Sequence, residues 1–211
     1  MKRDRQPFKD RQRRPGSGEK NRHEQWAFLL PYLGWFRRST FLLVLVLGRN
    51  YPVQFHIREL ARSLGYDASL ISRNLKQMEE AGLVTREHRG NLVLYQADMN
   101  SVLLRQMKVW LTLLELKDIT RDLGPVAANA ILYGSCARGE DTQESDIDLF
   151  IEATDKERVE EILGTYRDGI PRELSVIINT PDETYRLKSE NRVLYENIQR
   201  GISLKGGEDV L

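Results

Sequence analysis

The 211-residue sequence contains a single cysteine, Cys136, which excludes an internal disulfide and a zinc site built from cysteines. It also lacks a long apolar run. The longest, Phe41 to Leu47, falls well short of the roughly 20 residues that a membrane-spanning helix needs. The N-terminus is charged and has no apolar stretch followed by a small-residue cleavage site. These absences predict a cytoplasmic protein with no membrane span and no secretory signal.

The sequence has almost no net charge, because 32 Lys and Arg residues balance 31 Asp and Glu residues to give +1. The distribution along the chain is uneven. Residues 1–24 carry nine basic and four acidic side chains, residues 25–99 carry nine and six, and residues 100–211 carry fourteen and twenty-one. The three parts are therefore +5, +3 and −7. This asymmetry predicts a basic front and an acidic back that belong to different domains.

The first 24 residues show no apolar periodicity and include Pro7, Pro15 and the run Gly16-Ser17-Gly18. Ordering such a segment would cost chain entropy while burying little apolar surface, so a disordered basic arm is predicted. Two roles remain open for the arm: contact with nucleic-acid phosphates, or simple solubilisation.

Residues 25–99 predict three helices followed by a β-hairpin. Apolar residues at helical spacing indicate helices over 41–47, 56–64 and 68–81, and alternating segments indicate hairpin strands over 83–87 and 92–95. The expected end signals are N-caps at Ser39-Thr40 and Asp67, helix stops at Gly65 and Gly82, and a turn over 88–91.

This order of elements resembles the winged helix-turn-helix family over about residues 39–97. The resemblance implies DNA binding, in which the third helix presents polar and basic side chains to a major groove. A protein-contact module whose polar face is only solvated is the alternative. The expected DNA-contacting residues are Ser69, Ser72, Arg73, Lys76 and Gln77 on the helix, and His88 and Arg89 in the wing.

An amphipathic helix is predicted from Asn100 to about Leu114. It could connect two domains, form the seam of a homodimer, or open the next domain. Its expected apolar side consists of Leu103, Leu104, Met107, Trp110, Leu111 and Leu114.

Two short segments carry the residues best suited to chemistry. A predicted strand over 130–133 runs into Gly134 and Ser135, where backbone N–H groups, a hydroxyl and the nearby Arg138 suit a triphosphate. Ten residues separate Ser135 from Asp146, and alternation along a second strand sets Asp146 and Asp148 on one face. Two such carboxylates are typical ligands for Mg²⁺ that bridges to substrate phosphates.

The Gly-Ser pair, ten-residue spacing and Asp-x-Asp resemble the minimal nucleotidyltransferases of the DNA polymerase β superfamily, over about residues 111–207. The resemblance implies a small mixed-sheet domain that uses Mg²⁺ to transfer a nucleoside monophosphate from a nucleoside triphosphate, with ATP the first candidate. It assigns phosphate binding to Gly134 and Ser135, and metal binding to Asp146 and Asp148. Some members are antitoxins that modify a toxin partner, so a protein acceptor is one form of this hypothesis and a nucleic-acid acceptor another.

The sequence departs from that family at the third carboxylate. The next strand, expected over 173–179, places Ser175 at the aligned position, and serine is a weak metal ligand and a poor base. Glu173 lies two residues earlier and could substitute. Nucleotide and metal binding are therefore better supported than turnover, and a regulator with an inactive domain that senses nucleotide or mediates dimerisation is the alternative.

The overall prediction is an α+β chain with two domains after the arm: a winged helix-turn-helix over 25–99, and a linker helix with a small mixed-sheet nucleotidyltransferase fold over 100–211. Helices are expected over 156–166 and 182–200, followed by a short strand over 202–204. In the last helix, Tyr185 and Tyr195 are expected to be buried, with stacking on a nucleotide base as the alternative.

Overall fold

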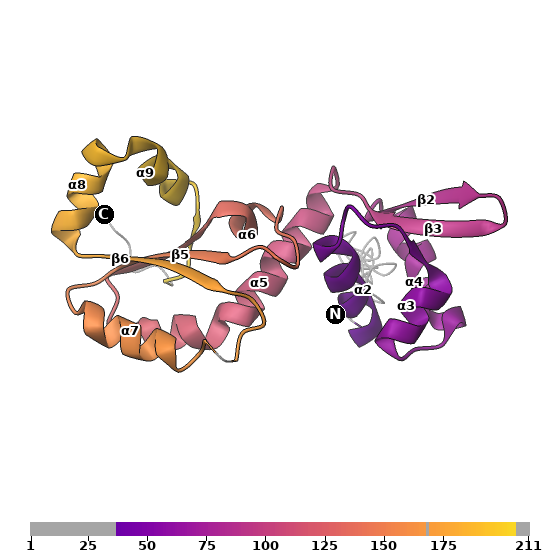
Figure 1. The fold of residues 1–211 in the computed structure, drawn as a ribbon, viewed down its shortest axis with the longest axis horizontal. Coiled ribbons are helices and arrows are strands. Elements are labelled where there is room, and N and C mark those ends of the chain that lie inside the picture. The colour runs from indigo at the N-terminus through magenta and orange to yellow at the C-terminus, as the bar shows by residue number, and fades with distance from the viewer. Residues whose placement is uncertain (1–36, 168, 206–211) are drawn as a thin grey trace, which may run out of the picture. The chain divides into compact units, whose positions relative to one another are not determined.

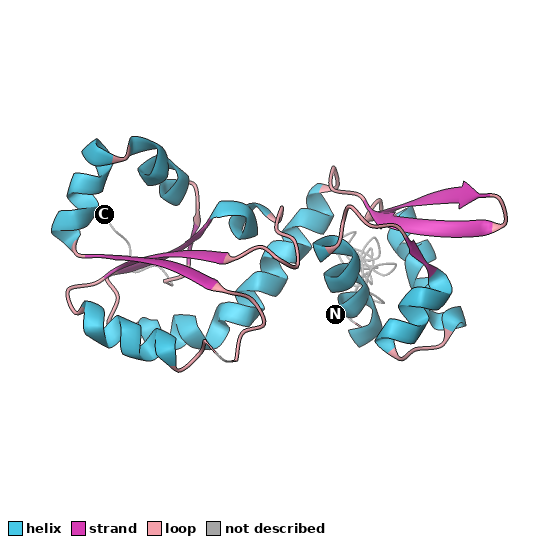
Figure 2. Ribbon diagram, viewed as in Figure 1, coloured by secondary structure: helices cyan, strands magenta, loops and turns pink. Residues whose placement is uncertain are grey.

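The computed structural model describes residues 37–167 and 169–205. The arm predicted over residues 1–24 lies outside the described residues. Within the described part, helices and strands are mixed and form two separate sheets (Figures 1 and 2). The predicted α+β class and the mixed sheet of the second domain are confirmed, whereas the domain boundaries stay a prediction.

The first sheet belongs to the winged helix-turn-helix part of the chain. Its three strands lie in the order β1-β3-β2, and both pairings are antiparallel. The elements of this part are α2 (Arg38–Arg49), β1 (Phe55–His56), α3 (Ile57–Leu64), α4 (Ala68–Glu80), β2 (Val84–Arg89) and β3 (Leu92–Ala97).

Local sequence signals explain where α3 and α4 begin and end. His56 accepts a hydrogen bond from the Arg58 backbone, and Glu59 accepts one from the His56 backbone, which closes a capping box. Gly65 ends α3 in the left-handed region, with φ of 69°. The predicted apolar stripe of α4 is confirmed by the burial of Ile71, Leu75 and Met78.

Two expectations for this part were wrong, and one short strand was missed. Ser39 and Thr40 do not cap α2. They lie buried inside it, and the Ser39 hydroxyl accepts a hydrogen bond of 2.9 Å from Asn74 Nδ2. The hairpin turn contains only two residues, Gly90 and Asn91, so His88 and Arg89 lie on strand β2. The short strand β1, which pairs with β3, was missed because two residues carry no periodicity.

Helix α5 (Val102–Leu123) ends nine residues later than predicted, and its fully buried residues share only Leu104 with the expected apolar side. Leu103, Trp110 and Leu114 of the expected apolar side are each more than 40% exposed. The dimer seam proposed for that side stays a prediction. The buried face instead consists of Leu104, Lys108, Val109, Thr112, Leu116, Ile119 and Leu123.

The second sheet has the strand order β6-β5-β4-β7, in which only β5 and β6 run parallel. The remaining elements are α6 (Gly134–Arg138), α7 (Lys156–Gly164), α8 (Pro181–Glu190) and α9 (Arg192–Gln199). The strands are β4 (Asn129–Tyr133), β5 (Ile147–Glu152), β6 (Leu174–Asn179) and β7 (Ile202–Ser203).

Helices cover both faces of this sheet, with α5 and α7 on one face and α8 and α9 on the other (Figure 1). Strand alternation sends Ile147, Leu149 and Ile151 into the core under α5 and α7. A smaller core on the opposite face contains Ile131, Tyr133, Phe150 and Ile198. Asp148 has the same strand parity as Phe150, which places it on the α8 and α9 side.

The single helix predicted over 182–200 is wrong, because the chain breaks at Asn191. This residue has φ of −141° and ψ of 75°, and its side chain accepts a hydrogen bond of 3.1 Å from Leu194 N to cap α9. Tyr185 is 83% exposed rather than buried, and Tyr195 is half-buried.

Among the residues described, no helix is both long enough and apolar enough to cross a membrane. The longest, α5, has 22 residues but carries charged side chains along its length.

Gly139 provides a test of how tightly the turn after α6 packs on α5. Its φ is 67°, and a Cβ there would overlap with the backbone carbonyl of Arg105. Gly139→Ala is therefore expected to lower the free energy of unfolding by at least about 2 kcal/mol. The matched control is Gly164→Ala at the end of α7, where no atom beyond the neighbouring residues and the helix's own backbone lies within 4 Å of the added methyl group. It should be neutral or stabilising by up to about 1 kcal/mol in the same urea titration, and equal effects would contradict this packing.

Candidate functional site

The pairing of β4 with β5 brings the Gly-Ser turn to the paired aspartates. Tyr133, the last residue of β4, lies opposite Asp148 on β5. Gly134 follows with φ of 71°, and a Cβ at that position would overlap with Asp148 Oδ2. The Asp148 carboxylate occupies the space that a side chain at residue 134 would need, so this position must be glycine.

The environment of Asp148 disfavours its charge. Burial raises the pKa of its carboxyl, and the neighbouring charge of Asp146 raises it further, while a hydrogen bond with Ser175 and the charge of Arg138 oppose the shift. Asp146 is exposed and stands just before β5. A bound cation would relieve the repulsion between the two carboxylates.

Ser175 occupies the position expected for a third carboxylate. The parallel ladder pairs Asp148 with Ser175, and the two side chains are hydrogen-bonded. Glu173 is exposed before the start of β6, and its backbone carbonyl accepts a hydrogen bond of 2.9 Å from Ile147 N. Within 37–167 and 169–205, no cluster of three or more His, Cys, Asp or Glu side chains could hold a metal ion. The donor set is therefore two carboxylates.

Two carboxylates fit one Mg²⁺ ion that arrives with a nucleotide, because this cation usually keeps several waters and takes its other ligands from phosphates. They do not provide the larger ligand set that a second protein-bound ion would need.

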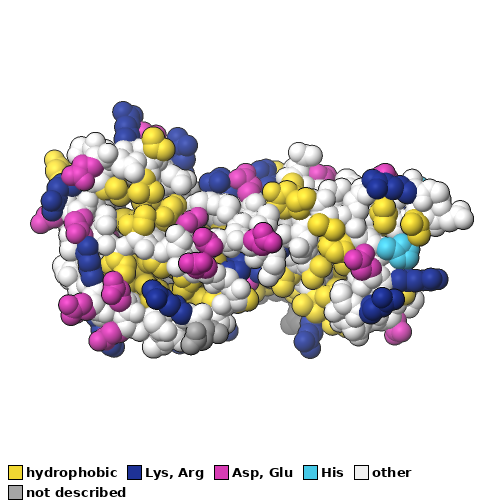
Figure 3. Space-filling model, viewed as in Figure 1, with side chains coloured by type: hydrophobic (Ala, Val, Ile, Leu, Met, Phe, Trp, Pro, Cys, Tyr) yellow, Lys and Arg dark blue, Asp and Glu magenta, His cyan; other side chains and the backbone are white. Residues whose placement is uncertain are grey.

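Figure 3 shows acidic side chains on the visible face of this domain near the ends at which β5 and β6 begin, and hydrophobic side chains beside them toward α8 and α9.

Arg138 was expected to stand near a bound triphosphate, which stays a prediction. Its guanidinium forms an ion pair with Glu140, at 2.7 Å between Nε and Oε2. The Arg138 side chain is exposed, and its charge still acts on Asp148. The guanidinium therefore stands at the edge of the candidate site, held by a solvent-exposed partner that a polyanion could displace.

Cys136 is fully buried, as expected for a packed residue with no chemistry of its own. Burial raises the pKa of its thiol, which keeps it protonated. Its Sγ donates to the backbone carbonyl of Asp146 at 3.3 Å. The residue thus ties the chain after Ser135 to the chain before Asp148.

Sequence reasoning missed a group of buried charges beside this site. Asp141, Lys108 and Arg172 are at most 5% exposed, and Arg49 and Glu115 join them through ion pairs. Charged residues are rarely buried unless paired. The only signal in the sequence was Lys108, which interrupts the apolar spacing of α5.

The predicted DNA-contacting side chains of α4 lie on its outer face. Ser69, Arg73, Lys76 and Gln77 are exposed, and Ser72 is half-buried. Lys76 lies 3.9 Å from Glu80. Among the described residues, no carboxylate forms an ion pair with Arg73, so its charge is free for a partner.

His88 and Arg89, the two wing residues predicted to contact DNA, are exposed on β2. Arg89 forms a 2.8 Å ion pair with Glu87, which in turn accepts a hydrogen bond of 2.6 Å from Gln54. The wing therefore presents a partly neutralised surface, and α4 presents the less neutralised one.

Two family models match separate parts of the chain. Residues 37–91 match the MarR family, and residues 113–199 match the nucleotidyltransferase domain. No curated protein matches this chain.

Three solved structures similar to this chain each align with about half of it. NolR from Sinorhizobium fredii is 19% identical, covering 47% of this chain and 94% of its own, with a TM-score of 0.35. HlyU from Vibrio cholerae N16961 is 18% identical, covering 45% and 96%, with a TM-score of 0.33. The homodimeric winged helix-turn-helix DNA-binding domain of Mb0332 from Mycobacterium bovis is 16% identical, covering 48% and 90%, with a TM-score of 0.35.

The raised pKa of Asp148 predicts a pH-dependent effect of its removal. The folded state keeps this proton to a higher pH than the unfolded chain, so between the two pKa values the free energy of unfolding falls as pH rises. Asp148→Asn should therefore be more stable than the wild type at neutral pH, by about 1 kcal/mol at most because solvent screens a half-buried group. The advantage should vanish below the ordinary carboxyl pKa of roughly 4. Urea titrations across this range measure the difference, and a pH-independent difference would contradict the assignment.

Proposed function

Because the chain joins a winged helix-turn-helix domain of the MarR type to a nucleotidyltransferase domain, we propose that it binds DNA and transfers a nucleoside monophosphate from a nucleoside triphosphate. ATP is the first candidate donor, and the acceptor is a protein, such as a toxin partner, or a nucleic acid. One observation carries the proposal: the Asp148 carboxylate lies directly against Gly134 at the Gly-Ser turn. The residues that would hold phosphate and metal thereby meet at one point.

In this proposal, different residues of the site bind the phosphates and the metal ion. Backbone N–H groups at Gly134 and Ser135 and the Ser135 hydroxyl donate to phosphate oxygens, while Arg138 supplies a positive charge at the edge. Asp146 and Asp148 hold Mg²⁺, which would neutralise charge on the triphosphate when bound. Binding would lower the pKa of Asp148, since a cation next to a carboxylate favours its ionised form.

Ser175 favours a second candidate function. Its hydroxyl is hydrogen-bonded to Asp148 and cannot act as a base at neutral pH, so the proton of an acceptor hydroxyl has no carboxylate on β6 to receive it. Glu173 is the nearest carboxylate before the strand, and it is exposed. On this second candidate the domain binds Mg²⁺ and nucleotide without turnover and regulates the DNA-binding domain.

Labelled ATP and Mg²⁺, incubated with the protein and with cell extract, should give a labelled acceptor. The double variant Asp146→Asn/Asp148→Asn should lower labelling at least about 100-fold, because it removes the metal ligands themselves. Glu157→Gln/Glu160→Gln is the matched control, since it removes two exposed carboxylates from α7 and should leave labelling unchanged.

The outcomes of this experiment distinguish the two candidates. A labelled band that is sensitive to protease identifies a protein acceptor, and one sensitive to nuclease identifies a nucleic acid. Mg²⁺-dependent ATP binding without labelling, lost in the double aspartate variant, supports the regulatory candidate. Absence of any Mg²⁺-dependent nucleotide binding would overturn both.

For the DNA-binding half of the proposal, Arg73→Ala should weaken binding to duplex DNA by roughly fivefold or more and reduce the salt slope by about 1 if Arg73 contacts a phosphate. The physical reason is that Arg73 is exposed on α4 and has no ion-pair partner among the described residues. Fluorescence anisotropy at several salt concentrations measures both quantities. The control Arg158→Ala removes the same charge from α7, where Arg158 pairs with Glu161. Equal losses in the two variants would indicate a nonspecific charge effect and favour the protein-contact alternative.

A further inference from the structure

The loop between α6 and β5 connects the two halves of the candidate nucleotide site, because it follows Ser135 and ends at Asp146. In the middle of this loop, Asp141 is fully buried. A buried carboxylate is strongly unfavourable without compensating charge, so its partners must be part of the fold.

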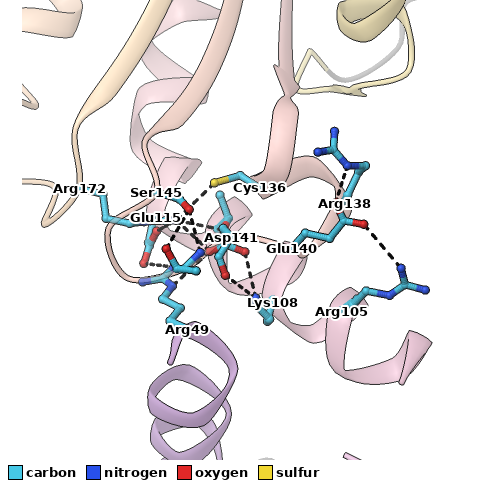
Figure 4. Close-up of polar contacts among 12 residues, drawn as sticks. Arg49, Arg105, Lys108, Glu115, Cys136, Arg138, Glu140, Asp141, Ser145 and Arg172 are labelled. Atoms are coloured by element: carbon cyan, nitrogen blue, oxygen red, sulfur yellow. Dashed lines mark hydrogen bonds and ion pairs between the residues drawn. The ribbon is translucent and has the colours of Figure 1, made fainter. Parts of the chain in front are cut away.

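Three cations from separate elements surround Asp141 (Figure 4). Arg172, just before β6, donates from Nη1 to Oδ2 at 2.9 Å. Lys108 of α5 donates from Nζ to the Asp141 backbone carbonyl at 2.6 Å and lies 3.5 Å from Oδ1. Arg49, the last residue of α2, lies 3.5 Å from Oδ2 through its Nε. The loop is therefore anchored by residues of three parts of the chain: the segment before β6, helix α5 and helix α2 of the winged-helix domain.

Arg49 makes two further contacts that tie α2 to the nucleotidyltransferase domain. Its Nη2 lies 2.7 Å from Glu115 Oε1 on α5, and its backbone carbonyl accepts a hydrogen bond of 3.0 Å from Gln143 N. Gln143 belongs to the same loop as Asp141. The end of α2 therefore contacts this loop through both its side chain and its backbone.

The cluster also reaches the nucleotide site directly. Arg172 Nη1 lies 3.3 Å from Cys136 Sγ, which in turn donates to the Asp146 carbonyl at 3.3 Å. Cys136 is the residue after Ser135. The same guanidinium thus contacts the chain beside the phosphate-binding turn and supports the backbone of the first metal-binding aspartate.

Stability alone does not explain this arrangement. The cluster buries three cations against the two carboxylates Asp141 and Glu115, and replacing a buried ionic group by packed apolar residues is often neutral or stabilising. Burial also lowers the pKa of Lys108, so its charge is maintained at a cost. The cluster instead provides directional contacts to the loop that contains Asp141, and apolar packing could not provide such contacts.

We propose that Arg49, although it lies in the winged-helix domain, is a positioning residue of the nucleotide site: through Asp141 it holds the loop that sets Ser135 and Asp146 relative to each other. The inference rests on the proposed function. It follows that the nucleotidyltransferase domain depends on the winged-helix domain, in the same chain, for tight binding of Mg²⁺ and nucleotide.

The test uses the full chain and measures two affinities, one for ATP with Mg²⁺ and one for duplex DNA. Arg49→Gln should raise the dissociation constant of Mg²⁺-ATP by roughly tenfold, the effect expected when support behind metal ligands is lost. Its dissociation constant for DNA should change by less than about twofold, since α4 is untouched. For Arg49→Lys, the dissociation constant of Mg²⁺-ATP should lie between those of the wild type and Arg49→Gln, because one ammonium group cannot contact both Glu115 and Asp141 as a guanidinium does.

Two further variants guard against loss of the fold. Arg49→Gln/Glu115→Gln removes one charge of each sign, and the new amide oxygen at 115 can still accept from Arg172, so it should fold and show the same weakened Mg²⁺-ATP binding. Arg62→Gln, an exposed residue at the end of α3, is the matched control and should change neither affinity.

The outcomes are distinct. Weakened Mg²⁺-ATP binding with intact DNA binding supports the inference. Unchanged Mg²⁺-ATP binding in both Arg49→Gln variants overturns it and leaves the proposed function standing. Parallel loss of both affinities overturns it in favour of a purely structural role, and a wild-type protein that does not bind Mg²⁺-ATP overturns the proposed function as well.

Discussion

The antiparallel pairing of β4 with β5 is the interaction on which the candidate site depends. It buries Ile147, Leu149 and Ile151 on one face, and the period of the strand then obliges Asp148 to stand on the other. The register that sets Tyr133 opposite Asp148 also sets the carboxylate against Gly134. A slip by one residue would send the aspartates into the core, so core packing and site geometry are specified together.

Helix α5 is the second structural constraint, because both sheets of the described chain are linked through it. Its buried face carries Lys108 and Thr112 between apolar residues, and both serve the buried charges around Asp141. A helix that only separated two domains would not need such residues. The buried cluster therefore joins α5 to the loop that leads to Asp146 in the candidate site.

Much of the fold and some of the site were predictable from local patterns. The helices around Gly65 and Gly82, the hairpin, and the strand-turn-strand with Gly-Ser and Asp-x-Asp depend on contacts within a few residues of each other, which periodicity and end signals describe well. Two of the failures have long-range causes. Leu103, Trp110 and Leu114 of α5 are exposed because the buried face turns toward Lys108 and Thr112, whose partners come from distant segments. Arg138 pairs with Glu140 through a turn that packs on Arg105.

The sequence by itself determined the order of the two domains, the Asp-x-Asp spacing after the Gly-Ser pair and the serine at the expected third-carboxylate position, because each of these is a matter of residue type at short spacing. Only the tertiary structure decided which charged side chains are buried and which residues form ion pairs with them. Asp141 is separated by 92 residues from Arg49 and by 31 from Arg172, and no local pattern encodes such a contact. Burial removes these groups from water, and they then require charged partners wherever the fold can bring them.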